Sequence, residues 1–191
     1  MRVSPAEYLS LDLRAHELLH DVPLYDVSVA DLPGGGDGRS VADVRALESS
    51  APPSRVANAL YGVRHLLGRA FGWDRVPMRP EDSLLSQLSE RDRHDSEIVP
   101  GTPDGPFRVL YRFHDESLSE IRNATVLGYV CIALARTANG YRLYFAVYVV
   151  PVSWATRPYL MVIEPFRRFI LYPAMLRRLR RAWVATYGAT R

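Results

Sequence analysis

The stretch from Thr125 to Val150 constrains the fold most, because it contains two apolar segments separated by Asn139-Gly140. Asn-Gly between segments rich in valine, tyrosine and phenylalanine is typical of a β-hairpin with a type I′ turn, which requires positive φ at both central residues. Such a turn would place Arg136 opposite Leu143 and continue the pairing along both strands. Neither face of the predicted hairpin is polar, so we expect other elements to cover both.

The segments before the hairpin predict further strands. Phe107 to Phe113 alternates as a strand does, His114 to Ser117 is predicted as a turn, and a strand then runs from Leu118 into the hairpin. Residues 107–152 would thus form a three-stranded antiparallel meander. The other predicted elements are a helix from Ser4 to His20 that begins in a capping box, a strand at 23–31, a short helix at 40–48, a helix at 55–71, a long surface loop at 74–105 with one helical turn near 84–88, and a helical tail from Trp154 interrupted by Pro158, Pro165 and Pro173.

These elements predict an α+β fold in which an antiparallel β-sheet meander wraps around a long C-terminal helix, with helices at the N-terminus. The length of 191 residues is typical of a single domain, so we expect one domain over residues 1–191, with an N-terminal helical segment at 1–22. The 48% hydrophobic and 24% charged fractions are those of a globular protein.

The sequence features that report on compartment favour the cytoplasm. No apolar run approaches the ~20 residues of a membrane-spanning helix, and acidic residues interrupt the N-terminal stretch where a signal peptide would be apolar. The single cysteine, Cys131, excludes an internal disulfide bond, and we interpret it as a buried strand residue.

His16-Glu17-Leu18-Leu19-His20 matches the H-E-x-x-H pattern of zinc peptidases, in which two histidines on one helix face bind Zn²⁺ and the glutamate acts as a general base. The predicted helix stops at Pro23, where the longer pattern of one such class has glycine, and Glu48 is the best third ligand. We therefore favour an amphipathic helix with two polar histidines, and we expect no bound metal and no cofactor.

Several phrases resemble a bacterial family catalogued as "domain of unknown function 2867". They are ALYGVRHLLGRAFGWD (59–74), RDRHDSEIVPGTPDGPFRVLYRF (91–113), SEIRNATV (119–126), GYRLYFAVYVVPV (140–152) and IEPFRRFILYPAMLRRLRRAW (163–183). That family is similar to the helix-grip proteins, the SRPBCC or polyketide cyclase-like superfamily, in which an antiparallel sheet wraps a long C-terminal helix. The resemblance implies a helix-grip-like domain over residues 23–191.

The polar residues that interrupt the apolar sheet are the candidate catalytic residues. If the strand runs unbroken from Ser119, Glu120 and Arg122 share a face with Val130, at the charged end of an apolar space under the C-terminal helix. Glu120 or His114 would then act as general acid or base, and Arg122 would hold an oxyanion. A structural ion pair and a solvated histidine are the alternatives, and a bulge near residue 123 would move Glu120 to the other face. The predicted ligand-binding residues are Tyr111, Arg112, Asn123, Val130, Ile132, Phe145, Val147 and Phe169.

Three functions remain open at this point. The first is a protein that binds a small hydrophobic molecule, or a cofactor-independent cyclase or isomerase that acts on one by acid–base chemistry. The second is a peripheral membrane or lipid-handling module, since the chain from Arg157 onward has eight arginines and one glutamate, a net charge of +7. The third is a zinc peptidase. No nucleic-acid partner is expected, and the face with Tyr129, Tyr144 and Tyr148 would pack under a helix, line a pocket or form a homodimer surface.

Overall fold

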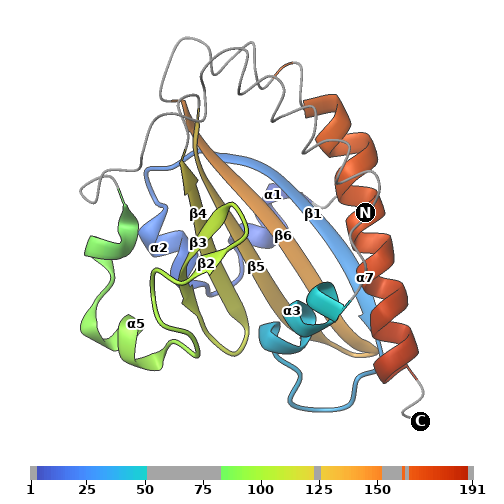
Figure 1. Ribbon diagram of the computed structural model, residues 1–191. Helices are drawn as coiled ribbons and strands as arrows, with labels where there is room; N and C mark the ends of the chain where they lie inside the picture. Colours follow the sequence, from blue (N-terminus) through green and yellow to red (C-terminus); the bar gives the residue numbers. More distant parts are fainter. Residues whose placement is uncertain (1–3, 51–82, 123–125, 152–160, 162–163, 189–191) are drawn as a thin grey trace.

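The computed structural model describes residues 4–50, 83–122, 126–151, 161 and 164–188, which form an antiparallel six-stranded sheet with helices on both sides (Figure 1). The order of the strands across the sheet is β1-β6-β5-β4-β3-β2. The strands are β1 (Leu24–Pro33), β2 (Pro103–Asp104), β3 (Phe107–Arg112), β4 (Glu116–Arg122), β5 (Val126–Thr137) and β6 (Gly140–Pro151). The predicted α+β class and antiparallel sheet are confirmed.

The hairpin of β5 and β6 forms, but its register differs from the predicted one by two residues. Arg136 lies opposite Tyr141 rather than Leu143, and Ala138 and Asn139 are the two turn residues. No described residue other than glycine has a positive φ, so the turn is not type I′. Gly140 has a φ of 140°, and a Cβ there would lie 2.4 Å from the Leu32 carbonyl oxygen. A shift of two residues keeps every side chain on its predicted face, because side chains alternate along a strand.

The prediction of one unbroken strand from Ser119 is wrong. β4 pairs antiparallel with β5, so the chain reverses direction between these two strands. β3 and β4 are joined by a turn at His114 and Asp115, where the Phe113 amide donates to the Glu116 carbonyl at 2.7 Å. The segment 107–151 therefore has four strands rather than three. The turn predicted at His114 to Ser117 included Glu116, which is in fact the first residue of β4 and lies opposite Ala133. This position depends on pairing with β5, which the local sequence does not reveal.

The predicted N-terminal helix is two short helices, α1 (Pro5–Leu9) and α2 (Arg14–Leu18). Ser4 caps α1 as predicted, its Oγ accepting from the Ala6 amide at 3.2 Å. The chain extends at Leu13 between the two helices, and this break lets Leu13 bury its side chain in the same cluster as Tyr8 of α1. Packing against the sheet thus overrides the helical pattern of the sequence.

The remaining helices include one that the sequence did not predict. The structure contains α3 (Val41–Ser50), η3 (Leu84–Gln87) and the unpredicted α5 (Glu90–Asp95), which begins in a capping box of Ser89 and Asp92. A π-helical turn, η4 (Arg167–Leu171), leads without a break into α7 (Tyr172–Tyr187). This turn bonds the Tyr172 amide back to the Arg167 carbonyl just before Pro173, which has no amide proton to donate. The helix predicted at 55–71 and the interruption at Pro158 lie outside the described residues.

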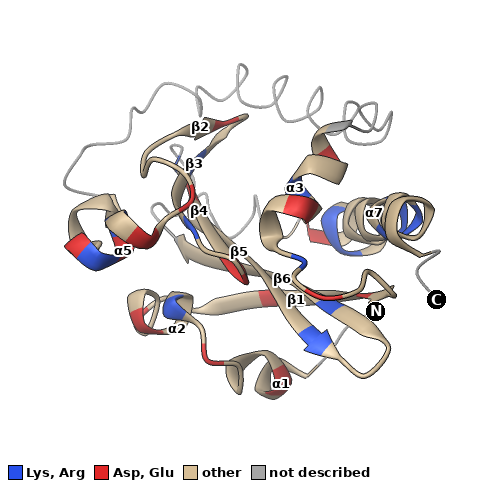
Figure 2. Ribbon diagram, turned by 90° about the horizontal axis from the view of Figure 1, so that it is seen from below, with Lys and Arg blue, Asp and Glu red and all other residues tan. Residues whose placement is uncertain are grey.

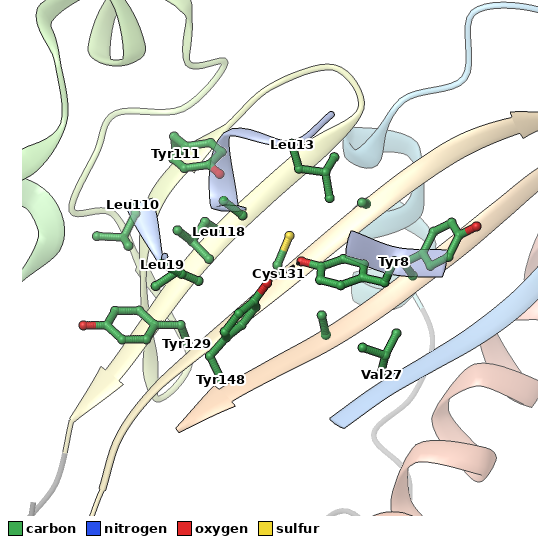
Figure 3. Close-up of a cluster of buried hydrophobic side chains, with 14 of the residues drawn as sticks. Tyr8, Leu13, Leu19, Val27, Leu110, Tyr111, Leu118, Tyr129, Cys131 and Tyr148 are labelled. Carbon is green, nitrogen blue, oxygen red and sulfur yellow. Dashed lines mark hydrogen bonds between the residues drawn. The ribbon is translucent and has the colours of Figure 1, made fainter. Parts of the chain in front are cut away.

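Figure 2 shows the sheet between two layers, with α3 and α7 on one side and α1 and α2 on the other. On the first side, Leu176, Leu179 and Trp183 of α7 pack with Ile132, Leu134 and Leu143 of the sheet and with Val41 and Val44 of α3. On the second, Tyr8, Ala15 and Leu19 pack on Leu118, Cys131 and Tyr148 (Figure 3). None of the described helices combines the length and apolarity that crossing a bilayer requires.

Candidate functional site

The side of the sheet that α7 covers, here called the α7-side face, carries a row of residues in register across four strands. Arg112 of β3 lies opposite Ser117 of β4, Ser117 opposite Ile132 of β5, and Ile132 opposite Phe145 of β6. Residues directly opposite one another in antiparallel strands share a face. Ile132 packs in the cluster of α7, so the whole row, Arg112 included, belongs to this face.

The apolar part of the α7-side face is only partly buried at its centre. Val130 lies opposite Val147 in the next row, and Val147 is buried against Tyr172 of α7. Val130 and Phe145 are half-buried and contact both apolar clusters on this side, and the Phe145 and Tyr172 rings are 5.1 Å apart. The structure therefore places five of the eight residues predicted to bind a ligand on one face of the sheet: Arg112, Val130, Ile132, Phe145 and Val147.

Backbone hydrogen bonds fix the position of Arg112, whereas one nitrogen of its side chain donates no hydrogen bond. The Arg112 amide donates to Ser96 Oγ at 3.1 Å, and its carbonyl accepts from the Glu97 amide at 2.7 Å. Its Nε is buried and has no hydrogen-bond partner among the described residues. Buried polar groups in native proteins nearly always have a partner, so an unsatisfied guanidinium nitrogen requires a specific explanation.

Charges of both signs lie near Arg112. Burial and the neighbouring Arg45 guanidinium lower the pKa of Arg112, while Glu97 opposes them. Arginine nevertheless remains protonated in proteins. Arg45 already pairs with Glu48 at 2.8 Å and with Asp104. A carboxylate or similar group at Nε would satisfy the donor and offset the charge in one contact.

Glu120 and Arg122, the predicted catalytic pair, do not lie on this face. Glu120 is opposite Tyr129, and Arg122 is opposite Leu127, so both residues share the side of α1 and α2. Glu120 is fully buried and accepts from Ser83 Oγ at 2.5 Å and from the Leu84 amide at 3.3 Å, which caps η3. Burial raises its pKa. The predicted sharing of a face with Val130 and Ile132 is wrong, because the chain reverses between β4 and β5.

The α1–α2 side contains a second polar cluster, here called the Glu116 centre: Glu116, Tyr111, Cys131, Tyr8 and Tyr148. Glu116 Oε1 accepts from the Arg14 amide at 2.9 Å, and thereby caps α2, whose own N-cap residue gives no side-chain bond. Burial raises the pKa of Glu116 to about 7, against the effect of the neighbouring Tyr111 hydroxyl and the α2 amides. Within the described part of the chain, Glu116 Oε2 and the Tyr111 hydroxyl have no well-formed hydrogen bond.

The other members of the Glu116 centre are buried, and Figure 3 shows them as part of the cluster on this side of the sheet. The Tyr148 hydroxyl donates to the Tyr8 hydroxyl at 3.2 Å, and burial raises the pKa of Tyr148 to about 12. Burial also raises the pKa of the Cys131 thiol, which makes it unreactive as a thiolate. Glu116 was not among the predicted site residues, because the sequence pattern predicts a turn at 114–117. The period-two spacing of Glu116, Leu118 and Glu120 is the signal that could have identified it.

The other predicted site residues lie apart from one another. His114 is exposed in the turn between β3 and β4, Tyr111 is on the α1–α2 side, and Phe169 is exposed on η4. Asn123 lies outside the described residues. These residues do not converge with Arg112 on one site.

The zinc-peptidase pattern does not form a pair of histidines on one helix face. α2 ends at Leu18, so His20 lies beyond it and places its ring by the Glu17 carbonyl and the Asp21 carboxylate. His16 instead packs edge-on to the Tyr8 ring at 4.9 Å. Across the described ranges, no three histidine, cysteine, aspartate or glutamate residues are arranged to hold a metal ion.

Comparison with known proteins gives the family of the chain. No curated protein and no solved structure is significantly similar to it. A family model described as "Protein of unknown function (DUF2867)" matches residues 18–174, which include every described strand together with α3, η3, α5 and η4. The chain therefore belongs to the DUF2867 family.

Proposed function

We propose that the protein binds a small, largely apolar molecule with one anionic group on the α7-side face, and that Arg112 binds the anionic group. The observation that carries this proposal is the buried Arg112 Nε, which has no partner among the described residues. A bound carboxylate, sulfonate or phosphate would satisfy it with a charge-assisted hydrogen bond.

The apolar part of the ligand follows from the neighbours of Arg112. Its row continues through Ser117 to Ile132 and Phe145, and Val130 stands in the next row. Mostly hydrophobic walls with a few orienting polar groups are typical of small-molecule sites. Val130 and Phe145 are half-buried, so they have surface left to contribute to such a contact.

Binding, rather than acid–base catalysis by Glu120, is the function this arrangement supports. Glu120 is on the opposite side of the sheet and is bonded to Ser83 and Leu84. A catalytic role for it would need the substrate to reach that side and to displace both partners. The cyclase or isomerase hypothesis therefore loses one of its two candidate acid–base residues, and the other, His114, is exposed in the turn between β3 and β4.

The experiment uses two fluorescent probes that differ mainly in charge. The probe 1-anilinonaphthalene-8-sulfonate has an anionic group, and N-phenyl-1-naphthylamine has the same ring system without it. We expect Arg112→Met to weaken binding of the sulfonate about 10- to 100-fold, as the loss of a hydrogen bond to a charged group predicts. The same substitution should leave binding of the neutral probe within about twofold, because methionine retains the apolar stem.

Arg91→Met is the matched control, because Arg91 is exposed on α5 and pairs with Asp95. It should change neither affinity. Equal weakening of both probes by Arg112→Met would indicate structural damage, and unchanged sulfonate binding would refute the anchoring role of Arg112. Native mass spectrometry of the protein purified from its source should then identify an anionic ligand that Arg112→Met no longer retains.

A further inference from the structure

The outward side of the C-terminal helix exposes large apolar side chains. Phe169 is 70% exposed, Phe166 48% and Ile170 44%. All three lie in or beside the π-helical turn η4, before α7 begins. Side chains of this size are normally buried, and several together on one surface indicate an interaction site.

Other side chains of the C-terminal helix pack it against the sheet. Its buried residues are Tyr172, Leu176, Leu179 and Trp183, spaced by three or four residues along the face that contacts the sheet. Phe166, Phe169 and Ile170 share the exposed side with Arg177 and Arg181, at helical spacing. The exposed side is therefore apolar in its first part and cationic in its second.

The cationic part has charge to offer a partner. Within the part of the chain that the structure describes, Arg177 and Arg181 have no ion-pair partner, whereas Arg168 is paired with Glu164 at 3.6 Å. The helical segment 164–187 has six arginines and one glutamate, a net charge of +5. The positive charge would attract an anionic partner and would give no electrostatic attraction to a neutral or cationic one.

We propose that this exposed side binds an anionic lipid membrane, with the helix lying in the interface plane. Phe166, Phe169 and Ile170 would enter the boundary between headgroups and acyl chains, and Arg177 and Arg181 would contact lipid phosphates. A membrane accepts apolar and cationic side chains on one flat surface. A nucleic-acid backbone would supply the negative charge but would leave the phenylalanine and isoleucine side chains in water.

Co-sedimentation of the full chain with vesicles tests the proposal. We expect binding to vesicles of phosphatidylcholine with about a third phosphatidylglycerol, weak binding to phosphatidylcholine alone, and a loss of binding as salt screens the charges. Arg177→Gln with Arg181→Gln should lower the partition coefficient about 30-fold, since each arginine near an anionic surface contributes a factor of about five. Phe169→Ser with Ile170→Ser should lower it at least as much, at low and at high salt.

Two control variants match these changes at another surface. Arg91→Gln removes a charge from α5, and Val99→Ser removes an exposed apolar side chain that is 76% accessible. Neither should alter vesicle binding, and circular dichroism should show all variants folded. The proposal is overturned if the protein ignores anionic vesicles, if the controls weaken binding as much as the helix variants, or if light scattering shows that Phe169→Ser dissociates a dimer.

Discussion

The two sides of the sheet are buried by different means. On the α7 side, the contacts are apolar and aromatic: Trp183 is fully buried with its ring centroid 5.7 Å from that of Tyr141 and 4.9 Å from that of Tyr187. On the α1–α2 side, the carboxyl groups of Glu116 and Glu120 are buried and cap short helical segments. The comparison indicates that apolar packing on the first side provides stability at any pH, whereas the second side depends on specific partners and on protonation.

The largest expected effect is a difference in stability between variants that lose a buried aromatic side chain on either side of the sheet. Trp183→Ala should lower the free energy of unfolding by about 3–5 kcal/mol, because the surrounding sheet and helix cannot collapse into the space. Tyr8→Ala should cost only about 2–3 kcal/mol, since the five-residue helix α1 can shift toward the sheet and fill part of the space. Urea denaturation measures both values.

Hydrogen exchange localises the two losses. In Tyr8→Ala, amides of α1 and α2 should exchange faster while those of β5 and β6 keep their protection. In Trp183→Ala, protection should fall throughout the sheet. Equal losses of stability with the same exchange pattern in both variants would show that the two sides unfold as one unit.

The second prediction concerns pH and the Glu116 centre. Burial raises the pKa of Glu116 to about 7 in the folded state, from its ordinary value of 4.5. The folded state therefore binds the proton more tightly than the unfolded state, so stability falls as pH rises from about 4.5 to about 7 and then levels off. The difference of about 2.5 pKa units corresponds to at most about 3 kcal/mol.

Glu116→Gln should remove most of this slope, because glutamine does not titrate and still accepts from the Arg14 amide. Urea denaturation from pH 5 to pH 8 measures the slope. Glu97→Gln, at an exposed position, should leave it unchanged. A Glu116→Gln variant with the full slope of the original chain would show that another group, such as the buried Glu120, causes it.

The same comparison explains which features the sequence predicted. The alternating apolar residues of β5 and β6 predicted both faces correctly even though the register was wrong, because a shift of two residues leaves each side chain on its face. Val130, Ile132, Phe145 and Val147 lie on one face for this reason, whereas the face of Arg112 depends on the pairing of β3 with β4. Their role in binding a ligand stays a prediction.

The side of Glu120 could not be predicted in the same way. Its face depends on where the chain reverses between β4 and β5, and an error of one residue there moves every side chain of β4 to the opposite side. Likewise, the break between α1 and α2 depends on the burial of Leu13 against the sheet, and the bond between Glu116 and the Arg14 amide joins residues 102 positions apart. Local patterns predict elements, whereas long-range pairing decides which buried carboxyl groups meet which partners.

The smallest expected effect concerns a polar group at the edge of the α7 side. Arg112 has a buried Nε without a hydrogen-bond partner among the described residues. An unsatisfied buried donor costs free energy, so Arg112→Met should raise the stability of the ligand-free protein by about 1 kcal/mol, while Arg91→Met should change it by less than about 0.5 kcal/mol. The expected result is therefore a protein that is more stable and binds the anionic probe less well. Such a trade of stability for binding is what a residue kept for a ligand should show. A loss of stability in Arg112→Met would instead mean that the guanidinium supports the fold, and its unpartnered Nε would then no longer argue for an anion site.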